Sequence, residues 1–182
     1  MDVTTLLNEA NAGSADAFDQ LAEALYPELK AMARRRSRGG PGIGATTLVN
    51  EAFVRMLSGG RLNSADRQQF FGLAAKIMRH VIVDEVRYLS AEKRSGRDVT
   101  LAETIVGDDA HERAEFLLQV DEMLSMLESE NERCARVFEC RYFAGLTTGE
   151  TAEALGISER TVERDWSSAR SRIASLIDDS SE

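Results

Sequence analysis

A stretch near the C-terminal end, GLTTGETAEALGISERTVERDW at residues 145–166, carries side chains suited to reading DNA. Arginine, hydroxyl and carboxylate groups recur at helical spacing in its second half and just beyond it. An arginine can pair with a guanine edge or a phosphate, and a glutamate can accept a hydrogen bond from cytosine. We therefore predict a DNA-contacting face made of Arg160, Thr161, Glu163, Arg164, Ser167 and Arg170.

The other reactive residue types do not form a catalytic or metal-binding pattern. Cys134 and Cys140 lie six positions apart, which fits neither a CxxC redox pair nor a zinc knuckle, so we expect buried thiols. His80 and His111 lack metal-ligand partners at helical spacing. Neither a Gly-rich phosphate loop nor a GxSxG nucleophile motif occurs. We expect no enzyme activity, no metal site and no cofactor.

The DNA-contacting face needs two helices at a fixed angle, and the same stretch contains the signals for them. Thr147 and Glu150 have the spacing of a capping box, which begins a helix. Gly156 fits the left-handed turn that ends this helix. Ser158 is the next N-cap, and Val162 lies one turn into the second helix as its core contact. This spacing is typical of a helix-turn-helix.

Helical periodicity dominates the rest of the chain, and only two prolines interrupt it. The apolar stripe of the last helix includes Trp166, which we assign to the core rather than to base stacking. Periodicity is lost between residues 90 and 109 and resumes at Leu117. The sequence therefore predicts an all-α fold with two small helical domains, at residues 1–90 and 113–182, joined by a flexible linker at residues 91–112. The helices expected in the first domain cover residues 2–11, 15–37, 47–57 and 67–89, with a hinge at Gly13.

Composition is that of a soluble globular protein, with 43% hydrophobic and 29% charged residues. No apolar run approaches the roughly 18 residues of a membrane span, so we expect no membrane insertion. The first residues, MDVTTLLNEANAGSADAF, contain neither a basic leader nor an apolar core. We expect a cytoplasmic protein.

Charge is distributed unevenly along the chain, whose formal net charge is −9. Residues 1–90 hold 11 Lys/Arg against 10 Asp/Glu, whereas residues 116–182 hold 7 against 14. The half with the DNA-reading motif is therefore the more acidic one. Neutralising phosphates supplies most of non-specific DNA affinity, so this half should bind free DNA poorly and need a partner.

These features resemble, nearly end to end, a sigma factor of bacterial RNA polymerase from the extracytoplasmic-function group. LLNEANAGSADAFDQL is similar to the opening helix pair of that group, and TTLVNEAFVRML resembles its polymerase-binding segment. FFGLAAKIMRHVIVDEVRYL resembles its promoter-melting helix, and RYFAGLTTGETAEALGISERTVERDW resembles the region that reads the upstream (−35) element. The resemblance implies that the first domain is a sigma region 2 bundle and the second a sigma region 4 helix-turn-helix.

The resemblance also implies roles for residues outside the helix-turn-helix. Core polymerase would be bound by Asn50, Glu51, Val54 and Arg55, while Phe53 faces the core. The downstream (−10) element would be contacted by Lys76, Arg79, His80, Arg87, Lys93 and Arg94. The loop at residues 60–68 matches the segment that selects the flipped-out base, and Asp84 has a structural role.

The implied function is promoter-specific initiation of transcription, with core RNA polymerase and promoter DNA as partners. The resemblance also allows an anti-sigma factor as a partner. An alternative reading is a dimeric helix-turn-helix regulator that binds operator DNA, with the N-terminal half as a sensor or dimerisation module. Co-purification with polymerase subunits distinguishes the two.

Overall fold

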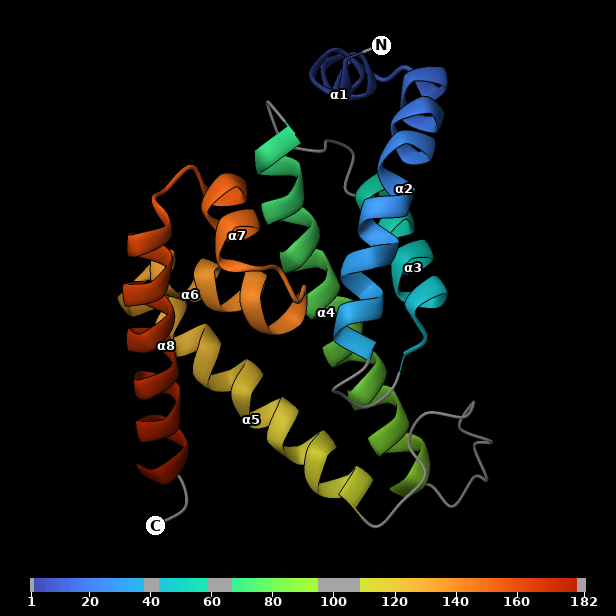
Figure 1. Cartoon of the computed structure of the whole chain (residues 1–182). Coiled ribbons are helices and arrows are strands. Elements are labelled where there is room, and N and C mark those ends of the chain that lie inside the picture. Colours follow the sequence, from blue (N-terminus) through green and yellow to red (C-terminus); the bar gives the residue numbers. More distant parts are fainter. Residues whose placement is uncertain (1, 38–42, 59–66, 95–108, 180–182) are drawn as a thin grey trace.

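The computed structural model describes residues 2–37, 43–58, 67–94 and 109–179, and every regular element in these residues is a helix (Figure 1). The all-α prediction is thereby confirmed. The elements, in chain order, are α1 (Val3–Asn11), α2 (Ala15–Ser37), α3 (Ala45–Ser58), α4 (Arg67–Arg94), α5 (Asp109–Glu130), α6 (Glu132–Phe138), the short π-helix η1 (Glu139–Phe143), α7 (Thr148–Leu155) and α8 (Glu159–Asp179). Of these helices, none is both long and apolar enough to cross a membrane.

The first four helices form a bundle. Gly13, with φ of 96°, makes the predicted hinge between α1 and α2, because glycine has no Cβ to oppose a positive φ. Helix α2 packs on α3, and α3 packs on α4. Phe53 of α3 is half-buried, stacked on Tyr26 at 6.4 Å and edge-on to Phe18 at 6.2 Å between ring centroids. The predicted core side of α3 is thus confirmed at Phe53.

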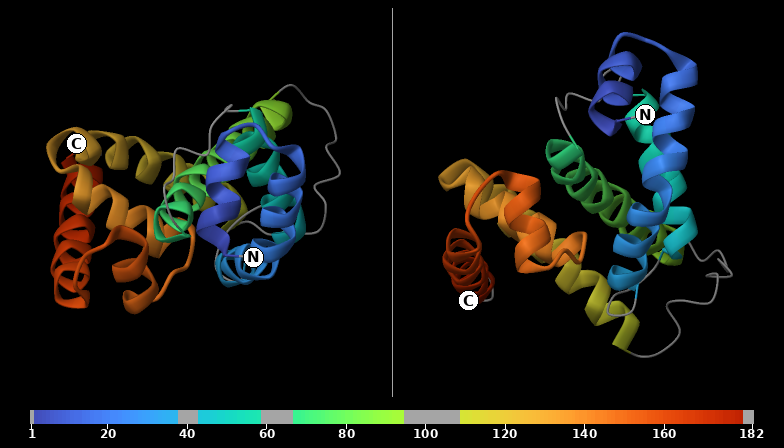
Figure 2. Two further views of the ribbon diagram at one scale, coloured as in Figure 1. Left: turned by 90° about the horizontal axis from the view of Figure 1, so that it is seen from above. Right: turned by 45° about the horizontal axis from the view of Figure 1, so that its top comes forward.

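The last helices form a second bundle, in which α5, α6 and α7 each pack against α8. Its core contains Leu117, Leu124 and Phe143, each almost fully buried. The apolar spacing expected from Leu117 onward therefore describes the buried side of α5. Helix α8 lies at the outer edge of the molecule, on the far side from α2 and α3 (Figures 1 and 2).

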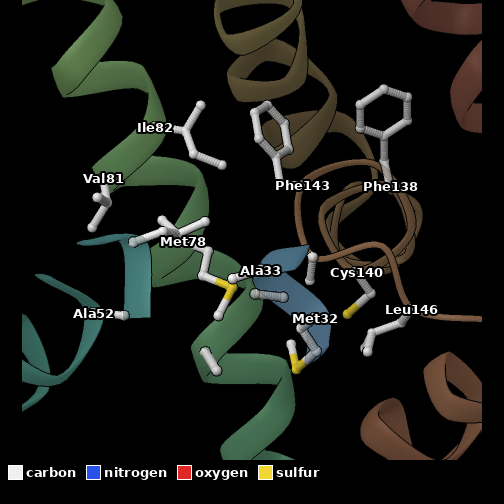
Figure 3. Packing of buried hydrophobic residues seen from close by; sticks show 14 of the residues in the cluster. Met32, Ala33, Ala52, Met78, Val81, Ile82, Phe138, Cys140, Phe143 and Leu146 are labelled. Carbon is white, nitrogen blue, oxygen red and sulfur yellow. The ribbon is translucent and has the colours of Figure 1, made fainter. Parts of the chain in front are cut away.

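Helix α4 belongs to both bundles, because it contacts α3 on one side and α5, η1 and α7 on the other. Its apolar side chains are buried almost all round, as expected for a helix enclosed by neighbours. Met78, Val81 and Ile82 of α4 lie between Ala52 of α3 and Phe143 of η1 (Figure 3). One continuous hydrophobic cluster results, and it extends from α1 to α8.

The packing of the two bundles differs from the pair of tethered domains that the sequence suggests. Helix α4 continues to Arg94, beyond the expected boundary at residue 90, and α5 already begins at Asp109. The residues expected as the central part of the linker, 95–108, lie outside the described part of the chain. The division into two domains and a linker stays a prediction, but in this arrangement the halves share a core.

Candidate nucleic-acid interface

The frame of the helix-turn-helix is built by local hydrogen bonds at the predicted positions. The Thr147 hydroxyl accepts from the Glu150 amide at 3.2 Å, and the Thr147 amide donates to the Glu150 carboxylate at 2.8 Å, which completes the capping box. Gly156 ends α7 in the left-handed conformation, with φ of 63° and ψ of 36°. The Ser158 hydroxyl accepts from the Thr161 amide at 3.2 Å and caps α8. The predicted capping box, the left-handed turn and the second N-cap are thus confirmed.

The two helices of the motif are held together by a small apolar cluster. Val137, Ala152 and Val162 are buried together, with Ile157 packed beside them. The predicted core role of Val162 is therefore confirmed. Trp166 lies half-buried against Phe138, with ring centroids 5.3 Å apart, so it packs in the interior as predicted.

The outward face of α8 carries the residues predicted to contact DNA. Arg160, Glu163 and Ser167 are exposed, and Thr161 is half-buried beside the Ser158 hydroxyl. Arg170 is exposed as well, with its guanidinium 5.7 Å from the centre of the Trp166 ring. A guanidinium over an aromatic face is attracted to it, so Trp166 stabilises the position of the Arg170 side chain.

Arg164 is mostly exposed, but it forms an ion pair with a carboxylate that was not among the predicted site residues. Its Nε and Nη2 donate to Oδ1 of Asp165 at 3.1 and 3.0 Å. Asp165 is buried and also accepts from Nε of Arg133 at 2.5 Å. Although burial raises the pKa of Asp165, the hydrogen bonds from Arg133 and Arg164 lower it below its usual range. Asp165 therefore stays ionised and orients the Arg164 side chain.

A signal for Asp165 was present in the sequence. It lies three positions after Val162 and four before Ala169, which places it on the apolar stripe of α8. A carboxylate at such a position is buried and needs a cationic partner. Arg164 provides part of that partner, with its Nη2 3.0 Å from Oδ1 of Asp165.

Three of the residues predicted for the downstream element point at carboxylates of the second bundle. Lys76 donates to Glu128 at 2.8 Å, and Nη2 of Arg87 donates to Asp121 at 3.0 Å. Arg79 lies between them with only 3% of its side chain exposed, whereas the prediction had it on a polar, DNA-facing side. Helix α5 covers that side of α4, and this explains the difference.

Arg79 is surrounded by hydrogen-bond acceptors. Its Nε donates to Oδ1 of Asp121 at 2.7 Å, and its Nη1 donates to Oε1 of Glu139 at 2.8 Å. Its Nη2 donates to the Asp121 carbonyl at 3.0 Å and to the Ser125 hydroxyl at 2.8 Å. Burial raises the pKa of Glu139, while the Arg79 guanidinium opposes that rise. Several charge-assisted hydrogen bonds thus stabilise the buried positive charge of Arg79.

Asp121 and Glu139 were not among the predicted site residues. Asp121 lies between Leu117 and Leu124 on the buried stripe of α5, and Glu139 interrupts an apolar run. Acidic residues within apolar stripes indicate a buried cation elsewhere in the fold. The sequence does not say which of its 22 basic residues that is.

The remaining predicted residues of α4 are less enclosed. His80 is exposed, and partial burial of its ring together with the positive charges of Arg79 and Lys76 lowers its pKa. Its imidazole is therefore neutral near pH 7. The predictions for Lys93 and Arg94 concern side chains outside the described part of the structure. Of the base-selecting loop predicted at residues 60–68, residues 60–66 also lie outside it.

The outer face of α3 carries the residues predicted to bind polymerase. Asn50 and Glu51 are exposed, and Val54 is 54% exposed although it is apolar. Arg55 donates from Nη1 to Oδ2 of Asp84 at 2.7 Å, which joins α3 to α4. Asp84 thus has a structural contact, as predicted. The face combines one apolar side chain with polar groups, which suits docking on another protein.

Both cysteines are buried free thiols, as predicted. Burial raises the pKa of Cys140 to about 12, so this thiol is protonated at neutral pH and a poor nucleophile. Within the described residues, no group of three or more Cys, His, Asp or Glu side chains is arranged to hold a metal ion.

Comparisons with known proteins find similarity over nearly the whole chain. The family model described as ECF sigma factor matches residues 1–179 of this chain. A solved structure, that of CnrH in complex with the cytosolic domain of CnrY, is 22% identical and covers 97% of this chain and 98% of its own, with a TM-score of 0.43. The search of curated proteins finds no match.

Proposed function

This chain belongs to the ECF sigma factor family, whose members direct RNA polymerase to promoters, and we propose how its residues divide that task. In our proposal α8 reads the upstream element, α4 binds the melted downstream element, and the outer face of α3 docks on core polymerase. The supporting observation is the capped helix-turn-helix with exposed arginines on α8.

We assign sequence reading at the upstream element to Arg160 and Arg164, with Glu163, Ser167 and Thr161 beside them and Arg170 at the edge. Arg160 and Arg164 are one turn apart on the exposed side of α8, so both can enter the same major groove. The carboxylate of Asp165 restricts the Arg164 side chain, and a pre-oriented guanidinium loses less entropy on pairing with a guanine.

We assign the downstream element to Lys76, Arg79, His80 and Arg87, with Lys93 and Arg94 at the end of the same helix. A neutral histidine ring can hydrogen-bond to an unpaired base or stack on it. Core polymerase is assigned to Asn50, Glu51, Val54 and Arg55. Their polar groups surround the exposed Val54 side chain, which is the kind of mixed surface that protein partners bury.

This role accounts for the acidity of the half that reads DNA. Core polymerase supplies the basic surface that holds phosphates, so the bound chain contributes selectivity rather than bulk affinity. The role is non-catalytic, and we place it in the cytoplasm with the polymerase and the chromosome. An anti-sigma factor is a further candidate partner. The family match leaves the alternative of an operator-binding dimer without support.

Run-off transcription with core polymerase over a promoter library tests the proposal. We expect transcripts from a narrow group of promoters, and only when the chain and core polymerase are both present. Gel-shift titrations should give tight, sequence-specific binding by the holoenzyme and weak binding by the free chain. Tight specific binding by the free chain, with no transcripts, contradicts the proposal and supports the operator-binding dimer.

A further inference from the structure

A buried carboxylate holds one edge of the Arg164 guanidinium. Asp165, the source of this carboxylate, is 2% exposed and lies on the buried side of α8, between the buried Val162 and Ala169. From α6, Nε of Arg133 donates to Oδ2 of Asp165 at 2.5 Å. The position of the carboxylate is therefore fixed by two helices, and the group is too enclosed to touch DNA itself.

The hydrogen bonds from Arg164 to Asp165 use one edge of the guanidinium and leave another. A guanidinium is planar and rigid, with donors along a side edge, Nε and Nη2, and along an end edge, Nη1 and Nη2. Both nitrogens of the side edge donate to Oδ1 of Asp165, at 3.1 and 3.0 Å. The Arg164 side chain is nevertheless 65% exposed. The end edge therefore remains for a ligand.

The end edge of an arginine suits one base better than the others. Its two N–H groups point in the same direction, so they need two acceptors side by side. In the major groove a guanine presents O6 and N7 in this arrangement. An arginine that turns freely can also pair with phosphates, which adds affinity without sequence preference. Holding the side edge of Arg164 therefore favours the pairing that discriminates between bases.

We propose that Asp165 is a positioning residue that sets base discrimination at the upstream element without touching DNA. It holds the side edge of Arg164, so that the end edge enters the major groove already aligned. This inference rests on the proposed function, because it takes the ligand of α8 to be the upstream element. Arg133 bonds chiefly to the other carboxylate oxygen, so its loss leaves the contact between Asp165 and Arg164 in place.

The first test replaces Asp165 with leucine, which suits a position on an apolar stripe. Asp165→Leu removes both acceptor oxygens, and the side chains of Arg133 and Arg164 are 51% and 65% exposed, so water can solvate them. Transcription by the holoenzyme is compared between the preferred promoter and promoters altered at the base pair whose preference is lost in Arg164→Ala. We expect the ratio of the two to fall about threefold to tenfold, because the released side chain must be ordered on binding.

A merely structural role of Asp165 predicts a different result. A destabilised helix-turn-helix would lower transcription from every promoter by the same factor and leave the ratio unchanged. In the double variant Arg164→Ala/Asp165→Leu, the ratio should equal that of Arg164→Ala alone, because Asp165 acts only through Arg164. An unchanged ratio in Asp165→Leu, or a further fall of the ratio in the double variant, overturns the inference.

A matched control removes one negative charge from the same helix. Asp178 is exposed near the C-terminal end of α8, away from Arg164. We expect Asp178→Asn to keep the promoter ratio within about twofold of that of the unaltered chain, as is usual for surface substitutions. If this control lowers the ratio as much as Asp165→Leu does, net charge rather than positioning is responsible and the inference is overturned.

The second test uses the unaltered chain, so it does not depend on whether Asp165→Leu folds. Exchange of arginine Nε–H protons with water is measured by NMR in the free chain, with Arg164→Lys to assign the signal. The Arg164 proton should exchange about tenfold or more slowly than that of the exposed Arg160, since a hydrogen bond protects it. Equal rates overturn the inference and leave the proposed function intact. A holoenzyme without transcripts, or one that Arg164→Ala does not impair, contradicts the proposed function instead.

Discussion

Helices α4 and α8 both present arginines at helical spacing, yet their surroundings differ completely. On α4, Arg79 is enclosed by carboxylates from another bundle, whereas on α8 Arg160 is exposed and Arg164 bonds to its own neighbour Asp165. The same residue type thus joins two halves of the fold in one place and faces solvent in the other. An arginine on a polar helix face is not a DNA contact until its neighbours are known.

The difference also separates two ways of preparing a binding surface. On α8 the guanidinium of Arg164 bonds to a buried carboxylate of its own helix, and its side chain stays 65% exposed. On α4 the donors of Arg79 are satisfied by carboxylates from α5 and η1. Removing single side chains from the two helices should therefore give opposite results in stability and in transcription, and the following predictions are ordered by expected effect.

The largest effect is expected for Arg79→Met. This change leaves the buried Glu139 without its cation and leaves Asp121 with only the exposed Arg87 as a partner. Breaking a buried pair in this way costs about 3–5 kcal/mol. Urea denaturation should show the loss in the free energy of unfolding. The control is Lys76→Met, whose pair with Glu128 is partly exposed and should contribute about 0–1 kcal/mol. Equal losses for the two variants would contradict the distinction between a buried and an exposed cation.

The next prediction compares variants on the inner and the outer face of α3. Phe53→Ala removes a half-buried ring that packs on Tyr26 and Phe18, and we expect a loss of about 2–4 kcal/mol. The double change Glu51→Ala/Arg55→Ala should keep the free energy of unfolding within about 1 kcal/mol of that of the unaltered chain. It should weaken binding to core polymerase. Denaturation and a polymerase pull-down measure the two quantities. Loss of stability alone in both variants would contradict the docking role.

A smaller effect is expected for Arg164→Ala, which tests the exposed side of the comparison. We expect transcription from the preferred promoter to fall about tenfold, since a base-reading arginine provides about 1–3 kcal/mol at one base pair. Thermal stability and core binding should stay nearly constant. On promoters already mutated at the contacted base pair, Arg164→Ala should lower transcription by a smaller factor.

The matched control for Arg164 is Arg133→Ala, because Arg133 is the other partner of Asp165 and lies on α6. Transcription by this variant should stay within about twofold of the unaltered chain. If the two variants lose transcription equally, Arg164 acts through Asp165 alone. If Arg164→Ala lowers transcription by the same factor on every upstream sequence, Arg164 contacts phosphate rather than a base.

The smallest effect is expected for Thr147→Ala, which removes the hydroxyl of the capping box. The loss should be about 1 kcal/mol of the free energy of unfolding, measured by thermal denaturation. Thr147→Ser keeps the acceptor oxygen and should restore most of that stability. A serine variant as unstable as the alanine variant would mean that the methyl group, and not the cap, stabilises α7.

The helix-turn-helix and the faces of α3 could be predicted from the sequence because their causes are local. The Thr147 cap and the Gly156 turn involve residues three or four positions apart, and such contacts form wherever the helix forms. The periodicity of α3 likewise separates the buried Val49 from the exposed Asn50. By itself the sequence determined the helical class, the motif and its outward arginines.

The tertiary structure alone decided which charges meet. Arg79 pairs with Asp121 and Glu139, which are 42 and 60 positions away. Neither periodicity nor capping connects such distant residues, and an arginine on a polar face has the same sequence pattern whether water, DNA or a carboxylate covers it. The second buried side of α4 arises when α5, η1 and α7 pack against it. Burial is a property of that packing, so the sequence could predict a polar face on α4 but not that α5 covers it.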